Sequence, residues 1–247
     1  MKINVLGVGF DNVTPEEALE HGAQLMEQPG FHYVVTPNPE FVLAAEKDEE
    51  FRSVLNGADL VIPDGIGVIY SAKLLGTPLK SRVPGIEFSA GMLAHMDNVG
   101  GRVFLLGAKP GVAELAAVNI SKDYPNLTIR VSGPHEGYFK EDEPVVQAVK
   151  EAKADLLFVC LGAPRQEKFM AKYGPEMGVK LAMGLGGSLD VYAGVVNRAP
   201  ECWQKLNLEW AYRLVKEPKR IGRMAKLPLV LVKSVLIRLS GGAKEEA

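Results

Sequence analysis

Asp64 is the residue of this chain best placed for acid–base chemistry. It stands between Pro63 and Gly65, directly after the apolar run 58–62, so a rigid neighbour and a permissive one would hold its carboxylate at the end of a strand. A carboxylate held in this way suits a general base. It also suits the N-cap of a helix that begins at Gly65, and the residues alone leave both interpretations open.

Loops of small and polar residues follow several apolar runs. These loops are 36–39, 63–65, 107–111, 162–166 and 184–188. In a parallel sheet the carboxyl ends of the strands lie at one edge, where open α/β folds bind ligands. The pattern therefore predicts one cleft that gathers all these loops. Thr36 and Asn38, in the first loop, are candidates for contacting a ligand there, or else turn formers beside two prolines.

The glycine-rich loops that begin at Gly107 and Gly184 are candidates for binding a phosphate or a nucleotide. Glycines let backbone N–H groups approach an anion at the start of a helix, although plain tight turns are the alternative. The chain contains no Asp-x-Asp pair, with which many sugar-nucleotide enzymes hold a divalent ion. The charge of a diphosphate would then be met by cations. Arg82, Lys109 and Arg165 are candidates, unless they are solvated surface charges.

Two other classes of site are disfavoured. The segment 7–12 begins like a dinucleotide-binding fingerprint, but Asn12 replaces the third glycine, which argues against a dehydrogenase. The 4 histidines are scattered, and Cys160 and Cys202 have neither metal-ligand spacing nor a disulfide framework. We therefore expect no metal and no other cofactor, and the cysteine usage indicates a reducing compartment.

Short apolar, β-branched runs alternate with stretches of helical spacing. The runs are 3–8, 31–35, 58–62, 103–106, 128–131, 155–161 and 179–183, and the helical stretches are 39–55, 65–75, 85–96, 110–121, 141–152 and 165–173. A further helix starts after Thr14, which forms a capping box with Glu17. Because parallel strands need crossover helices, this alternation predicts an α/β fold. We expect a Rossmann-like, largely parallel sheet sandwiched by helices.

Composition and charge limit the class of protein. The chain has 247 residues, 47% hydrophobic and 23% charged, which excludes a disordered or fibrous protein. Its start carries no secretory signal, so a cytoplasmic location is expected. The net charge of -2 conceals an asymmetry, since nine Lys and Arg face two Glu in 205–238, a balance of +7 that leaves -9 for the rest.

The basic segment divides the chain into an α/β catalytic domain, 1–199, and a basic amphipathic C-terminal appendage, 200–247. Within the appendage, 227–239 is apolar but too short and too charged to span a bilayer, so we expect it to lie on a membrane surface. The alternative is a helix docked on the core with a solvated basic face. Nucleic acid is not an expected partner, because the chain outside the appendage is acidic.

The motifs in these loops occur in an order that resembles the WecG/TagA/CpsF family of bacterial glycosyltransferases over essentially the whole chain. The segments that carry the resemblance are TPNPE (36–40), PDGIG (63–67), RVPG (82–85), LG (106–107), GYF (137–139), LGAPRQE (161–167), GLGG (184–187), RAP (198–200), EWAYRL (209–214) and EPKR (217–220). The resemblance implies transfer of N-acetylmannosamine from its UDP-sugar to N-acetylglucosamine on undecaprenyl diphosphate. The implied reaction belongs to wall teichoic acid synthesis, inverts to a β-1,4 linkage and uses no metal.

The resemblance also implies roles for single residues. Asp64 matches the family's catalytic base, and Thr36, Asn38, Arg82 and Gln166 match its other active-site positions. The expected residues for the UDP-sugar are Gly107, Lys109, Tyr138, Gly162, Arg165, Gly184, Gly186, Gly187 and Asp190, of which Tyr138 and Asp190 would contact the uridine.

The appendage has an expected role of its own. Arg213, Arg220 and Arg223 match basic positions that close over the site at the inner face of the cell membrane, where anionic lipid would be a partner. Family members can self-associate when this appendage is displaced, so a homo-oligomer is possible; the stretch 202–207 is more polar here than in much of the family, which weakens that expectation. A rival hypothesis is a membrane-associated nucleotide-binding scaffold module without catalysis. It would need the glycine loops and the appendage but not Asp64.

Overall fold

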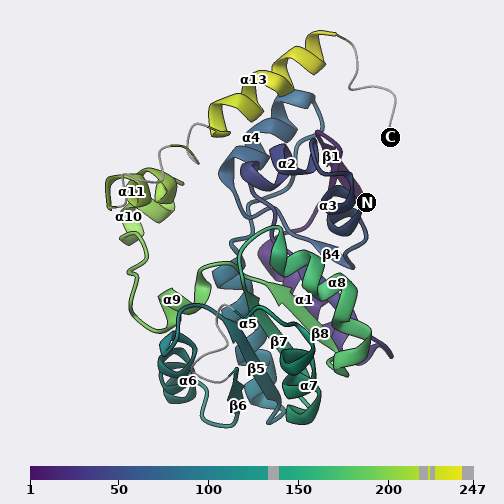
Figure 1. The fold of residues 1–247 in the computed structure, drawn as a ribbon. Helices are drawn as coiled ribbons and strands as arrows, with labels where there is room; N and C mark the ends of the chain where they lie inside the picture. The colour runs from purple at the N-terminus through teal and green to yellow at the C-terminus, as the bar shows by residue number, and fades with distance from the viewer. Residues whose placement is uncertain (133–138, 217–221, 223–225, 241–247) are drawn as a thin grey trace.

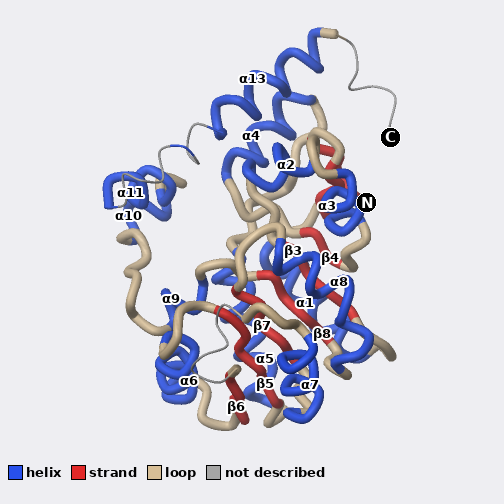
Figure 2. Tube along the Cα trace, viewed as in Figure 1, coloured by secondary structure: helices blue, strands red, loops and turns tan. Residues whose placement is uncertain are grey.

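A six-stranded parallel sheet forms the centre of the molecule (Figures 1 and 2). The computed structural model describes residues 1–132, 139–216, 222 and 226–240. The strands of this sheet are β3 (His32–Val35), β4 (Leu60–Val61), β5 (Arg102–Gly107), β6 (Thr128–Val131), β7 (Leu156–Cys160) and β8 (Leu181–Gly184). Their order across the sheet is β4-β3-β8-β7-β5-β6, and every neighbouring pair is parallel. The predicted α/β fold is confirmed.

Helices cover both faces of the sheet, as Figure 1 shows. One face packs on α1 (Pro15–Glu27), α5 (Gly85–Asn98), α6 (Val112–Asp123) and α9 (Ser188–Tyr192), and the other on α7 (Glu143–Ala152) and α8 (Arg165–Met177). The helices α2 (Pro39–Ala45), α3 (Glu49–Asn56) and α4 (Ile66–Leu75) belong to the same apolar cluster as this second face. Successive strand residues point to opposite faces, so Val34 joins one apolar cluster and Val35 the other. Both faces are therefore buried, as a parallel sheet requires.

The prediction of a single strand over 3–8 is wrong. Residues Leu6 and Gly7, with φ of 53° and 89°, form a tight turn between β1 (Lys2–Val5) and β2 (Val8–Asp11). These two strands pair antiparallel in a separate two-stranded sheet. Gly7 and Gly9 thus belong to a hairpin and not to the strand-to-helix turn that a dinucleotide-binding site needs.

Local capping explains where the first helices begin. The Thr14 hydroxyl accepts a hydrogen bond from the Glu17 N–H (3.2 Å), and the Glu17 carboxylate accepts one from the Thr14 N–H (2.9 Å), so the predicted capping box is confirmed.

The predicted helix over 39–55 is in fact two helices, α2 and α3. The Asp48 side chain accepts from the Phe51 N–H and so starts α3 as a new N-cap.

The chain after residue 200 contains α10 (Glu201–Lys205), α11 (Glu209–Lys216) and α13 (Lys226–Leu239). Helix α13 packs along α4 and α2. Glycines near both ends of α4 make this possible: Leu227 fills the space where a Cβ on Gly67 would stand, and the Arg238 guanidinium lies against Gly76. No helix among the described residues is long and apolar enough to cross a membrane. The domain boundary after residue 199 stays a prediction.

The cations of α13 point toward the α/β domain. Lys226 pairs with Glu40 (3.3 Å) and Lys233 with Glu46 (2.6 Å), while Arg238 donates to the Leu75 carbonyl (3.2 Å). Part of the positive charge counted in the sequence is therefore met inside the protein. The alternative of a helix docked on the core is correct for α13, and its basic side chains, although partly exposed, have partners in the domain.

The outward side of α13 is apolar. Leu229, Val232, Leu236 and Leu239 are 47%, 55%, 59% and 78% exposed, and Val235 lies beside them. Helix α13 thus has two different sides. One side is attached to the domain by packing and ion pairs, and the other exposes aliphatic side chains to the solvent.

The turn after β5 supports a first prediction. A Cβ on Gly107 would lie 2.5 Å from the Cys160 carbonyl oxygen, and the φ of Gly107 is +108°; Gly111, in the same loop, has φ +83° and open space around its Cα. Gly111→Ala should lose about 1–2 kcal/mol of stability from the left-handed backbone alone. Gly107→Ala should lose at least about 1 kcal/mol more, because it also overpacks the β5–β7 contact. Denaturant unfolding of both variants measures the difference, and equal losses would contradict the close approach.

Candidate active site

The Gln166 side chain joins two of the predicted loops. Its Oε1 accepts hydrogen bonds from the Gly162 N–H (3.2 Å) and the Gly186 N–H (3.0 Å), and its Nε2 donates to Glu167 Oε1 (2.6 Å). Gln166 is 1% exposed. It is therefore a buried brace between the loops that follow β7 and β8.

Thr36 and Gly85 connect this brace to the loop after β4. The Thr36 hydroxyl donates to the Gly184 carbonyl (2.9 Å), and a Cβ on Gly184 would lie 3.0 Å from Gln166 Nε2. Thr36 also packs on Gly85, where a Cβ would be 3.1 Å from its methyl group. The Gly85 N–H in turn donates to Asp64 Oδ1 (3.0 Å). Hence four predicted site residues, Thr36, Asp64, Gln166 and Gly184, occupy one continuous part of the sheet edge.

Asp64 is not the N-cap of α4. The N-cap is Gly65, and no side chain caps that helix. The half-buried Asp64 carboxylate instead accepts from the first residue of α5, Gly85, where the helix dipole favours a negative charge. Asn38 does cap a helix, since its Oδ1 accepts from the Glu40 N–H (2.8 Å) at the start of α2. A Cβ on Gly65 would lie 3.2 Å from the Asn38 Cβ, so the two loops touch.

Arg82 braces the loop that carries Asp64. Its Nε donates to the Asp64 carbonyl oxygen (2.7 Å), and its Nη2 donates to the Glu209 carboxylate of α11. Glu209 also pairs with Arg198 (3.4 Å). The sequence reasoning did not select Glu209 or Arg198 as site residues, although both lie in motifs that carry the family resemblance.

The other predicted residues are distributed along the same edge. The loops at Gly107, Gly162 and Gly184 follow β5, β7 and β8, and Lys109 is exposed in the first of them. Asp190 is in the first turn of α9, with a carboxylate oxygen 3.7 Å from the position of a Cβ on Gly187.

Arg165 is engaged with the chain that follows β6. It donates to the Phe139 carbonyl (2.6 Å), lies 4.3 Å from the centre of the Phe139 ring and is 3.7 Å from the Asp142 carboxylate. The positive charge of Arg165 is therefore already partly compensated by Asp142 and the Phe139 carbonyl when no phosphate is bound.

Four predicted residues have no side-chain position in the structure. Tyr138, Arg220 and Arg223 lie outside the described residues. Arg213 is in α11, but its side chain is not described.

Burial controls the titration of two groups at this edge. It raises the pKa of the Glu167 carboxyl to about 7, against the opposing effect of the hydrogen bond from Gln166. It raises the pKa of the Cys160 thiol to about 12, which excludes a thiolate nucleophile there at neutral pH. In the described part of the chain no group of three or more His, Cys, Asp or Glu side chains is arranged to hold a metal ion.

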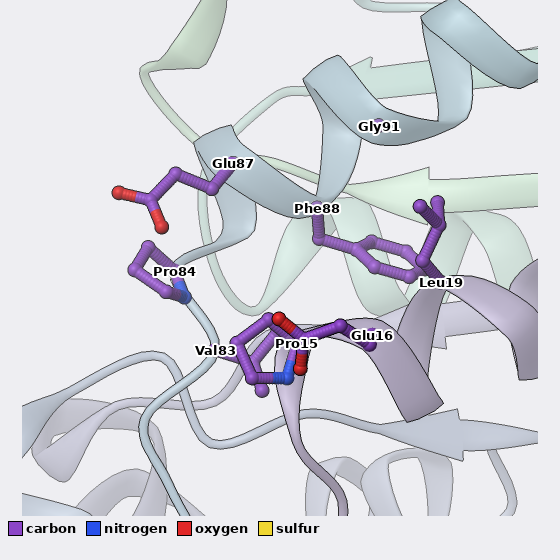
Figure 3. A pocket seen from close by; sticks show the side chains of 8 residues that line it. All are labelled: Pro15, Glu16, Leu19, Val83, Pro84, Glu87, Phe88 and Gly91. Atoms are coloured by element: carbon purple, nitrogen blue, oxygen red, sulfur yellow. The ribbon is translucent and has the colours of Figure 1, made fainter.

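A small cavity of about 160 Å³ lies behind the segment that follows Arg82, between α1 and α5 (Figure 3). Figure 3 shows Leu19 and Phe88 side by side, with Glu87 directed away from them. Its walls are mostly apolar and contain none of the predicted site residues. The candidate site is therefore the loop edge around Asp64 and Gln166 and not this cavity.

Comparison with known proteins identifies the family of the chain. The model of the glycosyl transferase WecG/TagA/CpsF family matches residues 3–244, and the chain belongs to that family. Relatives from Staphylococcus aureus strains MRSA252, MW2 and NCTC 8325 / PS 47 are each 37% identical over 237 residues, which is 94% of this chain and 91% of the relative. Each relative is named N-acetylglucosaminyldiphosphoundecaprenol N-acetyl-beta-D-mannosaminyltransferase. This chain is therefore a glycosyltransferase of the same family.

The buried Glu167 leads to a prediction on stability and pH. The pKa of Glu167 is raised in the folded protein from the ordinary 4.5 to about 7. Its contribution to the free energy of unfolding is therefore complete below pH 4.5 and is lost as the pH rises through 7. At about 1.4 kcal/mol for each pKa unit, the loss is on the order of 3 kcal/mol.

The test is urea unfolding at pH 5 and pH 8. Glu167→Gln, which keeps an acceptor for Gln166, should lose less stability between these pH values than the wild type does. Glu176→Gln, an exposed change on the same helix, should keep the wild-type difference. An unchanged pH dependence in Glu167→Gln would contradict the assignment.

Proposed function

We propose that the chain transfers N-acetylmannosamine from UDP-N-acetylmannosamine to N-acetylglucosamine on undecaprenyl diphosphate, forming the β-1,4 linkage of the wall teichoic acid linkage unit. Family membership and the names of the S. aureus relatives support this substrate pair. The observation that carries the proposal is the position of Asp64. A hydrogen bond from the start of α5 holds its carboxylate at the shared strand edge, beside Thr36 and Asn38.

In the proposed reaction Asp64 is the general base. Its carboxylate takes the proton from the 4-hydroxyl of the acceptor sugar while that oxygen bonds to the anomeric carbon of the donor. The bond from the anomeric carbon to UDP breaks on the opposite face, which inverts the configuration. The Gly85 N–H fixes one carboxylate oxygen and Arg82 fixes the main chain behind it, so the base is oriented before substrate arrives.

The donor would bind across the loops that follow β5, β7 and β8. The N–H groups of Gly162 and Gly186 already donate to Gln166, so these glycines shape the loops and do not bind phosphate through those amides. Lys109, Gly107, Gly184 and Gly187 remain proposed contacts, with Tyr138 and Asp190 at the uridine. Arg213, Arg220 and Arg223 would offset the charge that builds on the UDP leaving group in place of a metal ion.

The acceptor is anchored in a bilayer, so the enzyme must work at a membrane surface. We propose that the outward side of α13 enters the lipid interface, at the inner face of the cell membrane. Its exposed aliphatic side chains support this, whereas three of its cations have partners within the protein. Basic residues elsewhere in the appendage would add attraction to anionic headgroups, at about 1 kcal/mol each when close to the surface.

Release of UDP from UDP-N-acetylmannosamine, with and without lipid-linked acceptor and in the presence of EDTA, tests the reaction. Asp64→Asn should remain folded and bind UDP, but its turnover should fall by about 10² to 10⁴ because the general base is lost. Asp123→Asn, an exposed change at the end of α6, should keep wild-type turnover. Near-normal turnover of Asp64→Asn would contradict the assignment. UDP binding without any transfer would favour the scaffold module, and dependence on added metal would contradict the metal-free reaction.

Sedimentation with vesicles that contain anionic lipid tests the role of α13. The double change Leu229→Gln with Val232→Gln should reduce vesicle binding at least about tenfold, since burying each aliphatic side chain contributes on the order of 1.5–3 kcal/mol. The control pair is Leu115→Gln with Val118→Gln on α6. Leu115 and Val118 are 44% and 55% exposed, which matches the 47% and 55% of the two changed residues on α13. Equal binding by the two double variants would show that α13 does not contact lipid.

A further inference from the structure

Glu209 is a buried acid that meets two arginines of the α/β domain. It is 7% exposed, although it stands at the first position of α11. Its carboxylate accepts from Arg82 and lies 3.4 Å from the Arg198 guanidinium, which also pairs with Glu87 (2.7 Å). Charge-assisted contacts of this kind are strong where water is largely excluded. Glu209 is therefore a fixed point between the appendage and the site.

Apolar packing contributes little to the attachment of α10 and α11. Neither of the two apolar clusters of the domain includes a described residue of 201–216. The aromatic contact of this segment is internal, with Trp203 against Tyr212 at 5.8 Å between ring centres. Figure 1 shows the two helices beside the domain, joined to it by the chain that follows α9. Polar contacts, with those of Glu209 foremost, therefore have to set the position of α11.

The contacts of Arg82 extend this link to Asp64. The Arg82 guanidinium that donates to Glu209 through Nη2 also donates through Nε to the Asp64 carbonyl oxygen (2.7 Å). Docking of Glu209 thus stabilises the side chain that braces the loop of the proposed base. The Glu209 carboxylate also compensates the positive charge of Arg82. Arg82 therefore supports the Asp64 loop and is not an uncompensated cation that could bind a phosphate. Helix α11 contains Arg213, four positions after Glu209, so the docking also sets where that arginine's backbone lies.

We propose that Glu209 is a positioning residue for the transfer reaction: its ion pairs with Arg82 and Arg198 dock α11 against the loop that carries Asp64. The proposal rests on the proposed glycosyltransferase function for its effect on turnover. Its structural half, the docking of α11, stands independently of the substrate.

The two tryptophans of the chain report on this docking. Both Trp203 and Trp210 lie in the appendage, so the tryptophan fluorescence of the full chain comes from this segment alone. Glu209→Gln keeps the shape of the side chain and removes its charge. Glu201→Gln is the matched control, because Glu201 is an exposed acid of α10 that pairs with Lys205.

Glu209→Gln should raise the acrylamide quenching constant of the full chain about twofold and reduce turnover on the lipid-linked acceptor at least tenfold. Its dissociation constant for UDP should stay within twofold of the wild type. Glu209→Asp, which keeps the carboxylate, should recover part of both changes, and Glu201→Gln should match the wild type. A thermal melt by circular dichroism checks that each variant is folded.

Wild-type quenching in Glu209→Gln would overturn the docking, and greater quenching with wild-type turnover would overturn the positioning role. Lost turnover with unchanged quenching would also overturn the proposal, because Glu209 would then act without docking α11. If the wild-type chain itself transfers no sugar, the proposed function fails, while the quenching comparison still decides whether Glu209 docks the appendage.

Discussion

The edge of the sheet depends on the two hydrogen bonds that the Gln166 side-chain oxygen accepts. They satisfy the N–H groups of Gly162 and Gly186, which belong to different loops, through a residue that is itself buried. Both glycines are partly buried, and a buried Gln166 side-chain oxygen without a donor would be costly, so these two hydrogen bonds hold the loops at one separation. The Thr36 hydroxyl donates to the Gly184 carbonyl and so connects the loop that follows β3 to the same network. Asp64 then lies at the end of the adjacent strand β4, against a loop edge that is already rigid.

Much of this architecture could be predicted because the signals are local. Apolar runs located the strands, and parallel pairing placed their polar loops at one edge. The hairpin after residue 5 was missed because Leu6 adopts a positive φ that its residue type does not announce. Gln166 was assigned to the site by resemblance, but its bracing role depends on Gly186, which is 20 positions away. A contact of that range cannot be deduced from the spacing of residues.

The charge of the appendage shows a second limit of sequence reasoning. Counting Lys and Arg indicated a charge balance of +7 over 205–238. In the structure Lys226 and Lys233 pair with Glu40 and Glu46 of the helix α2 region, whose positions in the chain are more than 180 residues earlier. Net charge predicts long-range attraction but does not say which charges remain uncompensated. The apolar outward side of α13 is consequently the stronger argument for a lipid contact.

The two ends of the appendage are attached by different physical means, and this limits how it can move. Helix α13 is fixed by close packing on α4, where Leu227 occupies the space that Gly67 leaves, and by three polar contacts. Helix α11 is fixed mainly by the ion pairs of Glu209. Close packing resists small displacements, whereas an ion pair can separate as a unit when a competing charge or water enters. A displacement of α10 and α11 that breaks these ion pairs would therefore leave α13 on the domain, so the proposed membrane contact and the proposed docking of α11 need not depend on the same motion.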